Sequence, residues 1–183
     1  MSVSVDGFVS DRAGGFAWSA PSEDQFRFSL AQIGELGAYL CGRRLYETML
    51  PWETDPLMRR TPLGDAFADV WATLPKVVFS RTLDRVEGNA RLATAPVAEE
   101  VARAVGSTDR DVSIGGPDLA GQAIALGLLD EVRVFRNPVV LGGGTPFLPP
   151  VAEALVLELV DTRTFGGRVV YERYRRAPEA PGG

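Results

Sequence analysis

The sequence predicts an α/β protein with a mixed, mostly parallel sheet, and two stretches support this prediction. Asp111 to Leu148 contains a short apolar strand, a turn with paired glycines, a helix and a second apolar strand. A helix that links two strands so closely forms a β-α-β unit, which implies parallel strands. Ala154 to Thr164 and Arg168 to Arg175 alternate with a period of two on either side of Gly166-Gly167, which predicts a C-terminal antiparallel hairpin.

Length and composition set the class of protein. A chain of 183 residues that is 45% hydrophobic suits a single domain, which we place at residues 1–176. Residues 177–183 are rich in Pro and Gly, and we expect a disordered tail there. No apolar run reaches about 18 residues and no signal peptide is evident, so we expect a cytoplasmic protein without membrane contact. The net charge of −5 argues against nucleic-acid binding.

The absence of histidine and the single cysteine exclude several classes of enzyme. A Ser-His-Asp triad, a histidine-ligated zinc site and a His-x-Glu deaminase site are all impossible, and we expect no bound metal. One cysteine cannot form a disulfide within the chain, and the apolar surroundings of Cys41 predict a buried, unreactive thiol. A general acid must therefore be Asp, Glu, Tyr or water.

The N-terminal region predicts a strand followed by a loop. Residues 1–10 alternate like a strand, and the glycine-rich loop at 11–20 carries Phe16 and Trp18. Such a loop is either a mobile lid over a pocket or a surface loop held in place by its aromatic rings.

The next predicted element is a helix at 22–34. It begins with a predicted capping box, in which Ser22 caps the helix and Gln25 stands three residues later. Glu23 and Asp24 lie in the first turn, where acidic side chains interact favourably with the helix dipole. The apolar face of the helix comprises Phe26, Leu30 and Ile33.

Three predicted strands end in residues suited to binding phosphate. Paired glycines let backbone N–H groups approach an anion, and arginine offers a planar fork of donors. The strands and the residues that follow them are 38–41 with Gly42, Arg43 and Arg44; 76–79 with Ser80, Arg81 and Thr82; and 112–114 with Gly115 and Gly116. Because parallel strands place their carboxyl ends at one edge of a sheet, we expect these groups to form one ligand-binding edge.

The remaining elements follow from apolar periodicity and from the positions of Pro and Gly. A short helix is predicted between Gly42 and Pro51, and another begins at Pro117, which fits a first helical position. Further predicted elements are helices at 65–74 and 96–105 and strands at 91–93 and 132–140. Gly142-Gly143-Gly144 predicts a tight loop, with ligand contact as the less favoured alternative.

Six motifs stand in an order that resembles a known family. They are SVDGF at Ser4–Phe8, GRRLYE at Gly42–Glu47, KVVFSRTL at Lys76–Leu83, IGG at Ile114–Gly116, LLDE at Leu128–Glu131 and PVVLGGG at Pro138–Gly144. Together they cover nearly the whole chain, which looks like the dihydrofolate-reductase-like proteins related to the reductase domain of the bifunctional deaminase-reductase of bacterial riboflavin biosynthesis. The resemblance implies a three-layer αβα fold, whose sheet is closed by the C-terminal hairpin, and NADPH as the cofactor.

The resemblance also implies roles for single residues. Asp6 would lie at the substrate end as an acceptor that orients the substrate. Asp24 lies on the helix that carries the pterin-binding acid in dihydrofolate reductases; it is the leading proton donor, with water as the alternative. We expect Phe16, Trp18 and Phe28 to enclose it. The implied cofactor contacts are Gly42, Arg43 and Arg44 beside the adenosine phosphate, Ser80, Arg81 and Thr82 at the 2′-phosphate, and Gly115 and Gly116 at the pyrophosphate with Leu119 nearby.

The chain departs from the family pattern in two places. Leu45 stands where the family usually has Thr, which removes one hydroxyl contact to the cofactor. Only three residues precede Ser4, whereas relatives usually carry a longer first strand. We therefore expect a shortened central strand and leave open a truncated start.

Three functions remain open from the sequence. The leading one is an NADPH-dependent reductase that transfers hydride to a small pterin-like or pyrimidine-like heterocycle. The second is 5-amino-6-(5-phosphoribosylamino)uracil reductase of riboflavin biosynthesis, which would need a further phosphate site at the substrate end. The third is a nucleotide-binding module without turnover. We also expect a homodimer, because the exposed edge of the C-terminal hairpin needs covering and relatives commonly pair.

Overall fold

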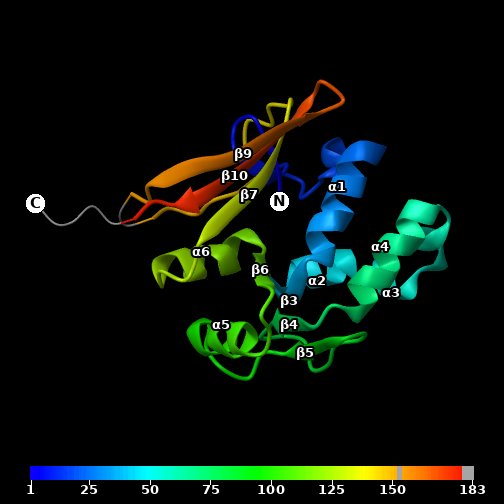
Figure 1. Cartoon of the computed structure of the whole chain (residues 1–183), viewed down its shortest axis with the longest axis vertical. Coiled ribbons are helices and arrows are strands. Elements are labelled where there is room, and N and C mark those ends of the chain that lie inside the picture. Colours follow the sequence, from blue (N-terminus) through cyan, green and yellow to red (C-terminus); the bar gives the residue numbers. More distant parts are fainter. Residues whose placement is uncertain (152–153, 179–183) are drawn as a thin grey trace, which may run out of the picture. The chain divides into compact units, whose positions relative to one another are not determined.

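The computed structural model describes residues 1–151 and 154–178 (Figure 1). Contacts divide the chain into two compact units. Unit 2 is the continuous segment Gln25–Gln122, whereas unit 1 combines Met1–Asp24 with Ala123–Gly183. Both ends of the chain therefore belong to the same unit. Among the described residues, no helix is long and apolar enough to cross a membrane.

Unit 2 contains a parallel sheet of four strands in the order β5-β4-β3-β6. The strands are β3 (Leu36–Gly42), β4 (Lys76–Phe79), β5 (Ala90–Leu92) and β6 (Asp111–Gly115). The inner strands β3 and β4 are apolar on both faces, as is typical of a parallel sheet that helices cover on both sides. The sequence predicted all four strands, and β4 has the predicted bounds.

Helices lie on both faces of this sheet, so unit 2 has three layers. α5 (Val97–Gly106) and α6 (Pro117–Ala125) pack on the face that presents Leu40 and Val77. On the other face, α1 (Glu23–Gly34) and α4 (Pro62–Thr73) form a second core around Trp71. Shorter helices of the unit are α2 (Arg43–Met49), α3 (Pro51–Thr54) and the 3-10 helix η2 (Pro56–Arg59).

Lys76, the only lysine of the chain, lies buried at the start of β4. Its Nζ donates to the carbonyl oxygens of Trp71 at 2.6 Å and Leu74 at 2.9 Å. The same atom lies 3.0 Å from Oε1 of Glu53 in α3 and 4.9 Å from the centre of the Trp71 ring. Burial lowers the pKa of Lys76, and the Glu53 carboxylate opposes that shift. One buried charge pair therefore joins α3 and α4 to the central sheet.

Unit 1 contains a mixed sheet in the order β1-β7-β10-β9. Figure 1 labels three of its strands, β7, β10 and β9. β1 runs parallel to β7, and β10 runs antiparallel to both β7 and β9. The strands are β1 (Ser2–Ser4), β7 (Glu131–Asn137), β9 (Leu157–Phe165) and β10 (Val169–Arg176). Gly166 and Gly167 connect β9 to β10 with φ angles of 56° and 67°, which glycine adopts without strain. The predicted α/β class, with parallel strands and a C-terminal antiparallel hairpin, is confirmed.

The N-terminal segment of unit 1 is held by local hydrogen bonds. β1 has only three residues, as the predicted shortened strand requires. It is an edge strand of the unit 1 sheet, however, and not the predicted central strand. β2 (Phe8–Ser10) pairs with β8 (Thr145–Pro146), and a 3-10 helix, η1 (Ala17–Ser19), follows. Oδ1 of Asp11 accepts from the N–H groups of Ala13 and Gly15 at 2.9 and 2.8 Å. These bonds fit the surface-loop alternative for residues 11–20.

Four predicted details differ in the structure. β7 ends at Asn137 instead of Val140, because Pro138 cannot donate to a strand ladder. Pro51 not only ends α2 but takes the first turn of α3. The predicted capping box of α1 is wrong, since Gln25 Oε1 is buried without a hydrogen-bond partner. Finally, the two strands of the predicted β-α-β stretch belong to different units: β6 pairs in parallel with β3, and β7 pairs in parallel with β1.

The predicted tail begins after β10. Ala177 is still ordered, because its N–H donates to the carbonyl oxygen of Val156 at 3.0 Å. Residues 179–183, which make up most of the predicted tail, lie outside the described part of the chain.

Candidate functional site

The carboxyl ends of three strands meet at one edge of the unit 2 sheet. In the parallel register, Gly42 of β3 stands beside Phe79 of β4, and Cys41 stands beside Gly115 of β6. The residues that follow these strands are therefore neighbours. The structure thus brings together the three segments that the sequence singled out: 42–44, 80–82 and 115–116.

Two glycines at this edge leave the backbone open, and a third is needed for packing. Gly116 has a φ of 95°, and a Cβ built there would lie 4.0 Å from the backbone nitrogen of Gly42. A Cβ on Gly42 would meet nothing within 4 Å, and no side chain caps the first turn of α2 that follows it. Gly115 differs, because a Cβ there would collide with Tyr39 and Leu45. Gly42 and Gly116 therefore leave space for an anion to approach the backbone closely.

Ser80 organises the loop that follows β4. Its Oγ accepts hydrogen bonds from the N–H groups of Thr82 at 3.1 Å and Leu83 at 3.0 Å. The Thr82 hydroxyl lies 3.5 Å from the same oxygen, and both Arg81 and Thr82 are exposed. Because Ser80 uses its lone pairs to hold the turn, its hydroxyl can act as a donor, either to the Thr82 hydroxyl or to an acceptor on a ligand.

Arginine side chains add positive charge to this edge. Arg43 pairs with Glu47 one turn along α2, with Nη1 to Oε1 at 3.2 Å, and both side chains are about half exposed. Arg44 and Arg81 are exposed, and within residues 1–151 and 154–178 no acidic side chain pairs with either. These two guanidinium groups are therefore the cations of the edge that can turn toward a ligand without leaving a carboxylate.

Leu119 contributes to the edge indirectly. Its side chain is 4% exposed and packs in the core with Ala38, Leu40 and Val97. It therefore packs α6 against the sheet and so fixes the position of the Gly115-Gly116 turn that precedes the helix. A direct contact of this side chain with a cofactor stays a prediction.

A carboxylate that the sequence analysis missed orders the loop after β5. Glu100 of α5 is fully buried and accepts from the N–H groups of Thr94 at 2.8 Å and Ala95 at 3.2 Å. Arg91 and Arg103 bind the same carboxylate, with Arg91 the closer. The hydrogen bond from Arg91 and those from the backbone lower the pKa of Glu100 to about 2. Only the position of Glu100 in the first turn of a helix marked it in the sequence, and many exposed acids share that feature.

Asp6 in unit 1 holds the triple-glycine loop. Its carboxylate accepts from the N–H of Gly142 at 2.7 Å and from that of Leu141 at 3.1 Å. Hydrogen bonds from Ser4 and from these two backbone groups hold the pKa of Asp6 below its usual range. Gly144 allows a close approach, since a Cβ there would collide with the carbonyl oxygen of Ser10. The structure thus gives Asp6 a positioning role, and contact with substrate stays a prediction.

The start of α1 presents two polar side chains in different environments. Asp24 is exposed and accepts a hydrogen bond from Ser22, so the predicted apolar enclosure is wrong; Phe16, one of its expected members, is itself 51% exposed. Gln25, the next residue, is 2% exposed and its Oε1 has no hydrogen-bond partner. A buried acceptor without a donor is uncommon and calls for a bound water or ligand. The sequence pattern could not reveal this, because Gln25 also fits a capping box.

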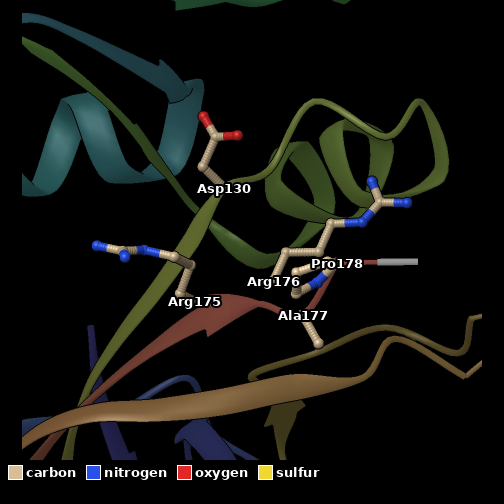
Figure 2. Close-up of a pocket in the computed structure, with 5 residues that line it drawn as sticks. All are labelled: Asp130, Arg175, Arg176, Ala177 and Pro178. Atoms are coloured by element: carbon tan, nitrogen blue, oxygen red, sulfur yellow. The ribbon is translucent and has the colours of Figure 1, made fainter. Parts of the chain in front are cut away.

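None of these residues lines the hollow of about 680 Å³ that unit 1 contains (Figure 2). Asp130, Arg175, Arg176, Ala177 and Pro178 line it. Figure 2 shows the guanidinium groups of Arg175 and Arg176 pointing in opposite directions, as successive residues of a strand do. Arg175 is also bound to Glu131 at 3.3 Å. The hollow therefore lacks the convergent polar groups of a binding site.

Comparison with known families assigns the chain. Residues 1–171 match the model of the RibD C-terminal domain. The chain belongs to this family. A curated relative, the uncharacterized protein YyaP of Bacillus subtilis strain 168, is 32% identical over 178 residues, which cover 93% of this chain and 89% of YyaP.

Solved structures show the same fold at lower sequence identity. A putative riboflavin biosynthesis protein from Shewanella sp. PV-4 superimposes with a TM-score of 0.78 at 20% identity, covering 97% of both chains. The deaminase/5-amino-6-(5-phosphoribosylamino)uracil reductase of Thermotoga maritima gives a TM-score of 0.65 at 18% identity; the match covers 96% of this chain and 55% of that one. Dihydrofolate reductase from Enterococcus faecalis, complexed with NADP(H), gives a TM-score of 0.60 at 17% identity. The match covers 97% of this chain and 94% of the reductase.

Leu45 stands where the resemblance described above led us to expect Thr. In this chain Leu45 packs in the core around Cys41 and Tyr46, and it lies where a Cβ on Gly115 would point. A hydrophobic contact between α2 and the β6 turn thus takes the place of a hydroxyl group.

Proposed function

We propose that the protein is an NADPH-dependent reductase that transfers hydride to a small pterin-like or pyrimidine-like heterocycle. The observation that carries this proposal is the convergence of 42–44, 80–82 and 115–116 at one edge of the unit 2 sheet. Open α/β sheets bind nucleotides at this edge. Membership of the RibD C-terminal domain family supports the assignment.

The residues at this edge fit a dinucleotide with a 2′-phosphate. The open space beside Gly42 and Gly116 suits the pyrophosphate, because glycine allows close backbone approach. Arg44 and Arg81, together with the Ser80 hydroxyl, suit the 2′-phosphate. NADPH would supply the hydride, and the protein would supply orientation and exclusion of water.

The substrate would meet groups at the start of α1. Gln25 Oε1 is a buried acceptor that an N–H of a pterin or pyrimidine ring would satisfy. The exposed Asp24 would deliver the proton from solvent, with water as the alternative donor. Hydride would add to a carbon of a C=N or C=O bond, and the proton would go to the adjacent nitrogen or oxygen.

Two alternatives follow from specific observations. The printed function of the Thermotoga maritima protein favours 5-amino-6-(5-phosphoribosylamino)uracil as the substrate. The second alternative is a nucleotide-binding module without turnover, because the relative YyaP is itself uncharacterized. Steady-state assays of NADPH oxidation separate the three functions. The assays are run with a dihydropterin, with the ribosylaminouracil phosphate and without acceptor. Binding of NADPH without oxidation by either acceptor would favour the module.

Calorimetric titration with NADPH and NADH tests the cofactor assignment. A charge-assisted contact to the 2′-phosphate contributes about 1.5–3 kcal/mol, which corresponds to about 10- to 150-fold tighter binding of NADPH. Arg81→Ala should reduce the difference in affinity between NADPH and NADH. Arg168→Ala, at the exposed turn of the hairpin, should leave this difference unchanged. Equal affinity of the wild type for both nucleotides would overturn the assignment.

A further inference from the structure

We propose that Tyr46 is a positioning residue of the candidate cofactor site, because its hydroxyl holds the loop 80–89 against α2. This loop connects β4 to β5, and its first residues are the segment 80–82. α2 begins with Arg43 directly after Gly42, and it also carries Tyr46. Tyr46 therefore connects two of the three segments that meet at the edge of the unit 2 sheet. The consequence for nucleotide binding rests on the proposed function.

The side chain of Tyr46 binds the backbone of one distant loop residue. Tyr46 is 5% exposed and packs in the core with Cys41 and Val78. Its hydroxyl oxygen accepts a hydrogen bond from the N–H of Glu87 at 2.7 Å and lies 3.5 Å from the carbonyl oxygen of the same residue. A buried tyrosine hydroxyl usually finds a hydrogen-bond partner, and here that partner is the main chain of the loop.

Packing carries this contact to the start of the loop. Leu83 and Val86 are half-buried and pack against the same core cluster as Tyr46. The N–H of Leu83 also donates to Oγ of Ser80 at 3.0 Å. Because Leu83 is fixed on one side by the core and on the other by Ser80, a loop that loosens at Glu87 also loosens the segment 80–82.

The far end of the loop has a separate anchor in Glu53 and Thr73. The N–H of Asn89 donates to Oε2 of Glu53 at 3.2 Å, and Nδ2 of Asn89 donates to the carbonyl oxygen of Thr73 at 2.7 Å. Between these ends, among the residues that the structure describes, Tyr46 alone forms a hydrogen bond with the backbone of 84–88. The middle of the loop therefore depends on one hydroxyl group.

The loss of this hydroxyl should change nucleotide selectivity. NADPH differs from NADH only in the 2′-phosphate, and the proposed function assigns that group to Arg44 on α2 and to Ser80 and Arg81 on the loop. Hydrogen bonds to one phosphate from two segments require the correct spacing between them, because such bonds weaken steeply with poor geometry. A looser loop should therefore weaken the binding of NADPH and leave that of NADH unchanged.

Calorimetric titration of the full chain with NADPH and with NADH tests this effect. Tyr46→Phe keeps the ring and should weaken NADPH binding by about 2- to 10-fold, the range that one hydrogen bond contributes, without changing NADH binding. Val86→Ala loosens the same loop through its packing and should have the same selective effect. Tyr174→Phe removes a tyrosine hydroxyl in unit 1 and should leave both affinities unchanged.

Two titration results would overturn the positioning role. One is an equal loss of affinity for both nucleotides in Tyr46→Phe, since a general loosening of the fold would act on both. The other is an unchanged ratio of the two affinities in Tyr46→Phe and in Val86→Ala, in a protein whose wild type prefers NADPH.

Hydrogen exchange without nucleotide gives a readout that does not depend on NADPH. In Tyr46→Phe the amide of Glu87 should exchange faster because it loses its acceptor, and the amides of Thr82 and Leu83 should follow. Unchanged exchange at Thr82 and Leu83 would overturn the positioning role. Faster exchange there, in a protein whose wild type binds NADPH and NADH equally, would contradict the proposed cofactor and support the positioning of the loop.

Discussion

At the scale of single residues, Lys76 shows how much one buried charge depends on its partner. Three acceptors surround its ammonium group, but only Glu53 carries a compensating charge. This pair was not predictable from the sequence, because the two residues are far apart in the chain and lysine is usually exposed. Removing one member of such a pair leaves the other charge unpaired in a buried site.

We expect Glu53→Gln to lower the free energy of unfolding by about 3–5 kcal/mol, the range typical of a broken buried ion pair. Urea denaturation at neutral pH measures the change. Glu47→Gln, which breaks the exposed pair with Arg43, should cost less than about 1 kcal/mol. Equal losses in the two variants would show that water already screens the Lys76 site.

Glu100 gives the protein an acid-sensitive stability. Its pKa falls from 4.5 in the unfolded chain to about 2 in the folded protein. A lowered carboxyl pKa contributes stability that is present above the unfolded value and is lost as the pH falls from about 4.5 toward 2. Glu100→Gln should therefore be less stable than the wild type at pH 7, and the difference should shrink across this window. Thermal unfolding at several pH values checks this; a constant difference would contradict it.

The positions of residues that are needed for their backbone conformation were predictable from the sequence. The surroundings of residues that pack against distant segments were not. The turn at Gly166-Gly167 and the glycine at 116 follow from the φ angles that only glycine adopts readily. The burial of Gln25 does not follow from any local pattern, because it depends on what packs around the helix start. The exposure of Asp24 was mispredicted for the same reason.

At the scale of elements, the loop at 141–144 depends on one carboxylate of another segment. Asp6→Ala removes the acceptor of the Leu141 and Gly142 N–H groups, so hydrogen exchange at these two amides should accelerate. Asp6→Asn keeps one acceptor oxygen and should show a smaller effect. Unchanged exchange together with a raised KM would instead assign Asp6 to substrate binding.

Strands were predicted best where hydrophobicity alone marks them. β4 has the predicted bounds because Pro75 precedes it and the polar Ser80-Arg81 follows. β7 was extended too far, since Val139 and Val140 are apolar although Pro138 ends the ladder. The partners of β6 and β7 could not be read from their closeness in sequence, because pairing is decided by strands elsewhere in the chain.

At the scale of the whole molecule, NADPH should stabilise the fold and leave a footprint confined to the proposed edge. At about 100 times its dissociation constant, a ligand that binds only the folded state adds about 2.7 kcal/mol to the unfolding free energy. Hydrogen exchange should slow at 42–44, 80–82 and 115–116. NADH at the same concentration should give a smaller thermal shift. Protection restricted to residues of unit 1 would relocate the nucleotide site.

The discontinuity of unit 1 has a consequence for the order in which the ribosome builds the protein. Residues 25–122 contain every strand of the parallel sheet and its core, so unit 2 can assemble while the C-terminal third is still being made. β1 must wait, because Met1 and Arg133 are hydrogen-bonded across 132 positions of chain. Closing so long a loop is slow compared with local contacts. The residues of β1 therefore leave the ribosome well before those of β7 and are among the last to find their partners.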